Sequence, residues 1–113
     1  MKKLIMLVCV LGLLAIGVTA IAGNLDYDMS RCERETGTGF LTCEGTLFNN
    51  SNKDLRYCEV SVLLLNNGKI IASESRPYVD IPSGSFSTKT MYFGKGIRDH
   101  THYRWSVVKI KFH

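Results

Sequence analysis

Alternation of apolar and polar residues is the main signal in the chain after residue 23. In residues 40–49, Leu41, Cys43 and Leu47 fall on one side of an extended segment, and threonine and glutamate fall on the other. A period of two residues is typical of a half-buried strand. No segment after residue 23 shows the apolar spacing of an amphipathic helix, so we predict an all-β domain.

Further stretches show the same alternation. The strongest is 56–65, which becomes apolar on both faces toward its end and therefore suits a central position in a sheet. In the last stretch the alternation slips by one residue near Val107 and Val108, which predicts a β-bulge. The other predicted strands are residues 69–76, 85–93 and 103–112, with weaker candidates at 27–33 and 78–81.

Turn-forming residues separate these stretches. Asn67-Gly68 supplies the two positive φ values of a type I′ turn, so the strands on either side should form a hairpin. Polar residues 50–54 and the proline and glycine within residues 80–84 should end the strands before them. About seven short strands separated in this way predict an immunoglobulin-like sandwich of two antiparallel sheets. A small closed barrel is the alternative.

The first 22 residues have the layout of a secretory signal peptide. Lys2 and Lys3 precede an uncharged apolar stretch, and small residues suit cleavage after Ala22. The alternative is an uncleaved anchor, because residues 4–25 carry no charge and about 20 apolar residues span a bilayer as a helix. Both interpretations place the domain outside the cytosol, either secreted or periplasmic, or held at the membrane through residues 4–25 alone.

These signals divide the chain into three parts. We expect a leader helix over residues 1–22, an extension over residues 23–39 with room for a short strand, and the sandwich over residues 40–113. The 91 residues that follow the leader, of 113 in the whole chain, can build one small core but not a two-lobed enzyme.

Three cysteines follow the leader, and an odd number in an oxidising compartment implies one disulfide and one free thiol. If residues 27–33 and 40–49 form a hairpin, Cys32 stands directly across from Cys43, close enough to bridge. The alternatives are a bridge from Cys32 to Cys58, with Cys43 free, or three buried thiols. Cys58 alternates with valines, so we expect it to fill the core.

Candidate catalytic chemistry is sparse. Asp99, His100 and His102 are the one cluster that resembles a metal site, but a zinc site needs three or four ligands, so a surface loop is the better interpretation. No serine stands in a G-x-S-x-G elbow, and no glycine-rich loop precedes a helix. We expect no enzyme activity, no metal and no cofactor.

Charge is unevenly spread along the chain. Without Lys2 and Lys3, 12 of the 14 basic residues remain against 10 acidic ones, a net charge of only +2. Residues 23–60 carry a net −3 and residues 89–113 a net +5. A basic, partly aromatic C-terminal surface could bind anionic envelope polymers or lipid headgroups. Its candidate residues are Lys95, Arg98, Arg104, Trp105, Lys109 and Lys111.

Several segments together resemble the FxLYD-type immunoglobulin-like domain of exported prokaryotic proteins. They are residues 45–51 (GTLFNNS), Leu55, residues 60–71 (VSVLLLNNGKII) and residues 81–84 (IPSG). Leu65 and Asn66 stand where the family has Tyr-Asp, and Val62 stands where it has phenylalanine. The resemblance implies a β-sandwich accessory or binding module and carries over no catalytic residue.

These observations favour a non-catalytic exported binding or accessory module of the cell envelope. Its partner would be an unknown protein or an anionic envelope component, and a mature net charge of +2 argues against nucleic acid. The alternative is a membrane-anchored structural or inhibitory protein that shields the envelope from a toxin, a phage or a hydrolase.

Overall fold

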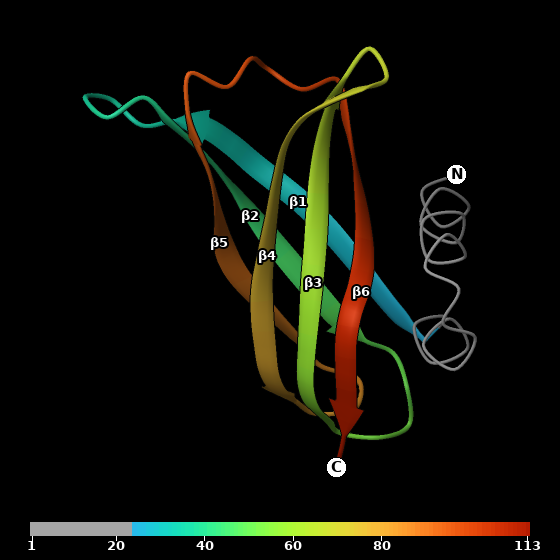
Figure 1. Cartoon of the computed structure of the whole chain (residues 1–113). Coiled ribbons are helices and arrows are strands. Elements are labelled where there is room, and N and C mark those ends of the chain that lie inside the picture. Colours follow the sequence, from blue (N-terminus) through green and yellow to red (C-terminus); the bar gives the residue numbers. More distant parts are fainter. Residues whose placement is uncertain (1–23) are drawn as a thin grey trace.

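The structure, a computed structural model, describes residues 24–113 as two layers of β-strands (Figure 1). The leader expected over residues 1–22 lies outside the described residues. Between residues 24 and 113 no helix has the length and apolar character needed to cross a membrane. The strands are β1 (Leu25–Arg34), β2 (Phe40–Asn49), β3 (Leu55–Asn66), β4 (Lys69–Ile81), β5 (Phe86–Lys95) and β6 (His102–Phe112).

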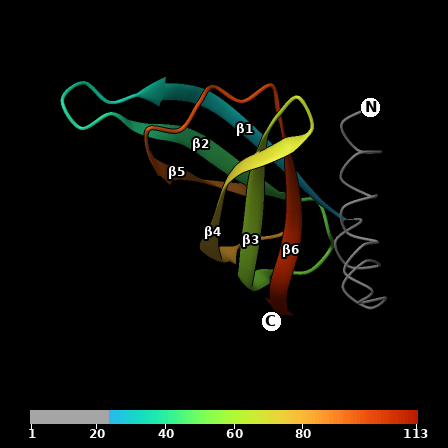
Figure 2. The ribbon, with the colours of Figure 1, turned by 45° about the horizontal axis from the view of Figure 1, so that its top comes forward.

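The strands form two antiparallel sheets of three strands each, in the orders β1-β2-β5 and β4-β3-β6. Figures 1 and 2 show these sheets as separate layers that pack on one another. The two-sheet sandwich is therefore confirmed, and the closed barrel is wrong for the described part of the chain. β1 is an edge strand of its sheet, so residues 25–34 belong to the sandwich and do not form an extension before it.

Residues 24–113 form six strands, and not about seven, because residues 69–81 form one continuous strand. Pro77 lies within β4 and pairs with Glu59 of β3. It does not end the strand, because β4 is a sheet edge, where a missing backbone donor is tolerated. The turn expected from residue 80 begins two residues later, where Ser85 N donates to Pro82 O at 3.0 Å.

The predicted hairpin between β3 and β4 is confirmed. Asn67 and Gly68 have φ angles of 50° and 87°, the two positive values that a type I′ turn requires. Asn66 and Lys69 pair across this turn. The turn therefore sets the register of the longest strand pair in the molecule.

The predicted bulge in β6 is also confirmed. Val60 of β3 pairs with Val107, whereas the preceding residue, Glu59, pairs with Lys109. Val108 is the extra residue between these pairs, and its side chain is half exposed. The bulge reverses the sides to which even- and odd-numbered residues point, so that Lys109 and Lys111 face solvent while Ile110 and Phe112 pack against the core.

Inward-facing residues of all six strands fill the space between the sheets. In β5 the inward residues are Met91 and Phe93, whereas Phe86 and Tyr92 point outward. Arg104 and Trp105 in β6 likewise point to opposite sides. The most deeply buried large side chains are Leu25, Tyr27, Leu47, Leu55, Leu64, Leu65, Tyr78, Ile81 and Met91.

A chain of hydroxyl groups crosses the core and joins the two sheets. Tyr27 of β1 and Tyr78 of β4 are fully buried, and their Oη atoms lie 3.0 Å apart. Tyr78 Oη donates to Gly45 O of β2 at 2.7 Å, so it accepts the proton of Tyr27. The Tyr27 ring also packs on Trp105 of β6, with 5.4 Å between the ring centroids. We call Tyr27, Gly45 and Tyr78 the tyrosine clasp.

Glycine at position 45 makes this arrangement possible. A Cβ atom there would overlap Oη of Tyr27 and approach Oη of Tyr78 to 3.0 Å. Real Cβ atoms do not approach buried neighbours so closely, and the two rings could not give way within a close-packed core. The backbone of β2 therefore approaches the tyrosine hydroxyls only because position 45 has no side chain.

Removal of single hydroxyls should reveal the order of donors in the clasp. Tyr78→Phe removes the bond to Gly45 O and also leaves the Tyr27 hydroxyl without its acceptor, so we expect a loss of about 2 kcal/mol in unfolding free energy. Tyr27→Phe keeps the bond from Tyr78 to Gly45 and should cost about 1 kcal/mol, as measured by guanidinium denaturation. Ser73→Ala on an exposed position is the control, with less than about 0.5 kcal/mol expected. Equal losses in the two tyrosine variants would contradict the proposed order.

The clasp also predicts how stability depends on alkaline pH. Burial raises the pKa of Tyr27 and of Tyr78 above the ordinary value of 10.0, so both hydroxyls stay neutral in the folded protein. The unfolded chain loses these protons above about pH 10. Their contribution to stability is therefore complete below this pH and declines above it. Unfolding free energy measured from pH 8 to 11 should fall more gently in the Tyr27→Phe/Tyr78→Phe double variant, and equal slopes would count against buried neutral hydroxyls.

Candidate functional site

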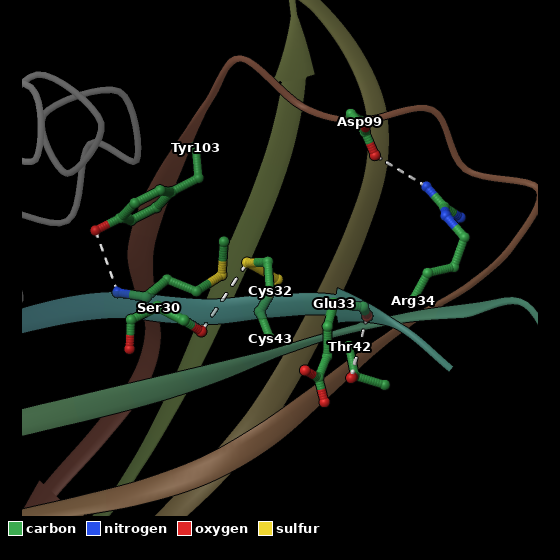
Figure 3. The surroundings of a disulfide bond; sticks show 9 residues. Ser30, Cys32, Glu33, Arg34, Thr42, Cys43, Asp99 and Tyr103 are labelled. Atoms are coloured by element: carbon green, nitrogen blue, oxygen red, sulfur yellow. Dashed lines mark hydrogen bonds and ion pairs between the residues drawn. A yellow bond between two sulfur atoms is a disulfide. The ribbon is translucent and has the colours of Figure 1, made fainter. Parts of the chain in front are cut away.

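The disulfide expected between Cys32 and Cys43 is present, with their Cα atoms 4.0 Å apart (Figure 3). A bulge in β1 sets this position. Ser30 pairs with Glu44 before the bulge, and Glu33 pairs with Thr42 after it, which leaves Cys32 opposite Cys43. A disulfide in this hairpin is compatible with an oxidising location outside the cytosol.

Cys58 is the free cysteine among the described residues, and its side chain is buried in the core. Burial, with a smaller effect of Glu59, raises the pKa of this thiol to about 12 from 9.0. A thiol that stays protonated is a poor nucleophile, so Cys58 acts as an apolar core residue, as expected. The alternative bridge from Cys32 to Cys58 is wrong.

The loop between β5 and β6 is tied to both sheets. Arg34 at the end of β1 donates to Asp99 Oδ1 at 3.2 Å (Figure 3), and it also donates to the carbonyl oxygen of Ile97. From the other sheet, Leu65 O accepts a bond of 2.7 Å from Thr101 N. Residues 96–101 therefore bridge the disulfide hairpin and the upper end of β3 as drawn in Figure 1.

The carboxylate and one histidine of this loop contact other residues. Asp99 is held by Arg34, and His102 Nδ1 lies 3.0 Å from Thr101 Oγ1. Within residues 24–113 no three histidine, cysteine, aspartate or glutamate side chains gather in a way that could hold a metal ion.

The structure brings together only part of the predicted basic surface. Arg104, Lys109 and Lys111 lie on the outer side of the β4-β3-β6 sheet, opposite Leu63, Glu59 and Tyr57 of β3. We call these three cations the β6 basic strip. They line the edge of the sheet along almost the whole length of β6.

The other predicted members lie elsewhere. Trp105 is 3% exposed and packs on Tyr27, so its inclusion in the surface was wrong, because strand alternation points it away from Arg104. Lys95 ends β5 in the other sheet, where its Nζ lies 5.9 Å from the centre of the Phe40 ring. Arg98 is an exposed residue of the loop before β6.

Small side chains surround the β6 basic strip on the outer side of its sheet. Ser61 of β3 pairs with Ser75 of β4 and with Ser106 of β6, and Ser73 lies beside Leu63. These serine side chains offer little steric obstacle to a partner. We call this outer side of the β4-β3-β6 sheet the basic face.

The opposite outer side, that of the β1-β2-β5 sheet, is acidic. Its outward positions hold four carboxylates, the guanidinium of Arg31 and, opposite Phe40 at the end of β5, the ammonium of Lys95, which gives a net charge of −2. Arg31 Nε lies 3.7 Å from a carboxylate oxygen of Glu44, and both side chains are exposed, so this pair adds little stability. The carboxylates belong to Asp26, Asp28, Glu33 and Glu44, and we call this side the acidic face.

An open cavity of about 590 Å³ lies on the acidic face beside the disulfide. Tyr92, which is 50% exposed, forms part of its wall. Carboxylates, hydroxyl groups and an exposed aromatic ring can together receive cationic groups. The lining residues are Arg31, Cys32, Glu33, Glu35, Thr42, Glu44, Thr90 and Tyr92.

The sequence reasoning missed the acidic face. Two features of the sequence indicated it. Residues 23–60 carry a net charge of −3, and Asp26 and Asp28 alternate with residues that are buried. Alternation alone does not show that β1 and β2 are neighbours of β5. The shared face becomes visible only with the pairing of the strands.

No known protein family matches this sequence, and no curated protein does. The chain is similar to several solved structures, and it shares its fold with the first of those that follow. IrmA from Escherichia coli superimposes with a TM-score of 0.55 at 6% identity, over 79% of this chain and 76% of that one. A transglutaminase from red sea bream has a TM-score of 0.47 at 11% identity, over 75% of this chain and 16% of the enzyme. DesR, a β-glucosidase from Streptomyces venezuelae, has a TM-score of 0.41 at 16% identity, over 61% of this chain and 10% of the enzyme.

The cysteine assignments can be checked by alkylation and mass spectrometry. We expect the folded, unreduced protein to resist iodoacetamide near neutral pH, because Cys58 is buried and protonated. Denaturation without reduction should expose one thiol, and proteolysis should recover Cys32 and Cys43 in one linked peptide. Rapid alkylation of Cys58 in the folded protein would contradict its placement. The Cys32→Ser/Cys43→Ser variant should lose about 2–3 kcal/mol of stability.

Proposed function

We propose that this protein is a non-catalytic binding module of the cell envelope that contacts anionic groups through its basic face. The domain would work outside the cytosol. It would either be released after cleavage of the leader or be held at the membrane by an uncleaved leader. The leader pattern of residues 1–22 supports export, and the disulfide is compatible with it. The sequence resemblance to the FxLYD-type domain agrees with an accessory or binding role.

One observation carries the choice of surface, namely the row of three cations along β6. Arg104, Lys109 and Lys111 share one side of the sheet, whereas the nearby Glu59 is the one acidic residue paired with this row. Cations near an anionic surface contribute about 1 kcal/mol each. Three of them, spread along one strand, suit an extended anionic surface better than a single small ion.

Vesicle binding tests this proposal. We expect the domain to bind vesicles of equal parts phosphatidylcholine and phosphatidylglycerol, and not vesicles of phosphatidylcholine alone. Lys109→Glu/Lys111→Glu should weaken binding about thirtyfold, because two attractive contacts of about 1 kcal/mol each are lost. Cosedimentation at low salt, repeated at about 0.5 M salt, measures the effect and its screening.

A matched variant separates the basic face from overall charge. Lys69→Glu/Lys95→Glu changes the net charge by the same amount, but Lys69 starts β4 and Lys95 ends β5, away from the C-terminal half of β6. We expect this double variant to lose about threefold or less in vesicle affinity, because long-range charge is screened. Equal losses from both pairs, or no binding by the unmodified protein, would rule out the basic face as the contact surface.

A further inference from the structure

The two outer sides of the sandwich carry opposite charge. The acidic face has four carboxylates against Arg31 and Lys95, and the basic face has three cations against Glu59. The sheets lie back to back, so these faces point in opposite directions in every molecule (Figures 1 and 2). Each copy of the chain therefore carries both halves of a complementary pair.

Shape also permits contact between these faces. Both are outer surfaces of three-stranded sheets whose strands span 10 to 13 residues. Serines and threonines occupy much of the central area, and such small side chains allow two sheets to approach to about 10 Å. They are Ser61, Ser73, Ser75 and Ser106 on the basic face and Thr42, Thr46, Thr88 and Thr90 on the acidic face.

Exposed apolar side chains on both faces would gain from such a contact. Phe86 is 61% exposed on the acidic face, where its ring packs on Phe48, and Tyr92 lies on the same strand. Val79 is 48% exposed on the basic face, beside Tyr57. Burial of apolar surface would add to the attraction of opposite charges.

We propose that the acidic face of one copy docks on the basic face of a second copy. The contact joins two different surfaces, so it leaves one free face of each kind and can continue from copy to copy. This inference rests on the proposed function, because it names the protein's own acidic face as a partner of the same basic surface. Self-association and binding to an anionic vesicle would then compete for the β6 basic strip.

Sedimentation velocity of charge-reversed variants tests the contact. The unmodified domain at submillimolar concentration and about 20 mM salt should show at least about a doubling of weight-average mass, and a single-chain mass at about 0.5 M salt. Arg104→Glu/Lys111→Glu makes both faces acidic, and Asp26→Lys/Glu33→Lys makes both faces basic or neutral. Each variant alone should remain a single chain, because like charges then face one another.

Mixing the two variants is the decisive step. The acidic face of the first and the basic face of the second are both unmodified, so the mixture should recover association to within about threefold of the unmodified domain. A mixture that stays monomeric, or an unmodified domain that is monomeric at low salt, overturns the proposal. Self-association that persists in either single variant overturns it as well, because that result would place the contact elsewhere. Circular dichroism confirms that each variant is folded.

The same variants separate this proposal from the proposed function. Asp26→Lys/Glu33→Lys alters the acidic face only and should abolish self-association while vesicle binding is kept or strengthened. If the unmodified protein binds vesicles but does not self-associate, the docking proposal alone is overturned. Self-association without vesicle binding would overturn the proposed envelope contact and leave the docking of two copies standing.

Discussion

The contact between three strands at the tyrosine clasp is the constraint on which the remaining structure depends. Tyr27 and Tyr78 come from different sheets, and their hydroxyl groups meet over Gly45, the one place where β2 has no side chain to exclude them. A buried hydroxyl without a partner would cost about 1–3 kcal/mol, so the sheets can pack only with these groups in register. The clasp therefore fixes how one layer sits on the other.

This packing decides what the surface presents. Once Tyr27 faces inward, Asp26 and its even-numbered neighbours in β1 must face outward, and the pairing of β1 with β2 places Glu44 on the same side. On the other sheet, the bulge at Val108 turns Lys109 and Lys111 outward while the C-terminal end of β6 still packs against the core. Two sheets with opposite outer charge follow from the alternation within each strand and the order of the strands.

Local features of the sequence predicted much of this fold because their causes are local. The turn at Asn67-Gly68 needs only its own φ values, the bulge follows from a slip in the apolar pattern, and the bridge between Cys32 and Cys43 follows from a short hairpin. The strand count and the acidic face depend on which strands are neighbours. Residues 69–76 and 78–81 were predicted as separate strands, whereas they are parts of the single edge strand β4, and Trp105 was assigned to the surface on composition without regard to its side of β6.

The most direct test of the packing is the exchange of the tyrosine hydroxyl protons, observed by nuclear magnetic resonance. If Tyr27 donates to Tyr78 and Tyr78 donates to Gly45 O inside a dry core, both hydroxyl protons should give resolved, slowly exchanging signals. The Tyr78 proton should also show a nuclear Overhauser effect to the Gly45 α protons. Hydroxyl protons that exchange with water too fast to be seen in a folded sample would contradict the account.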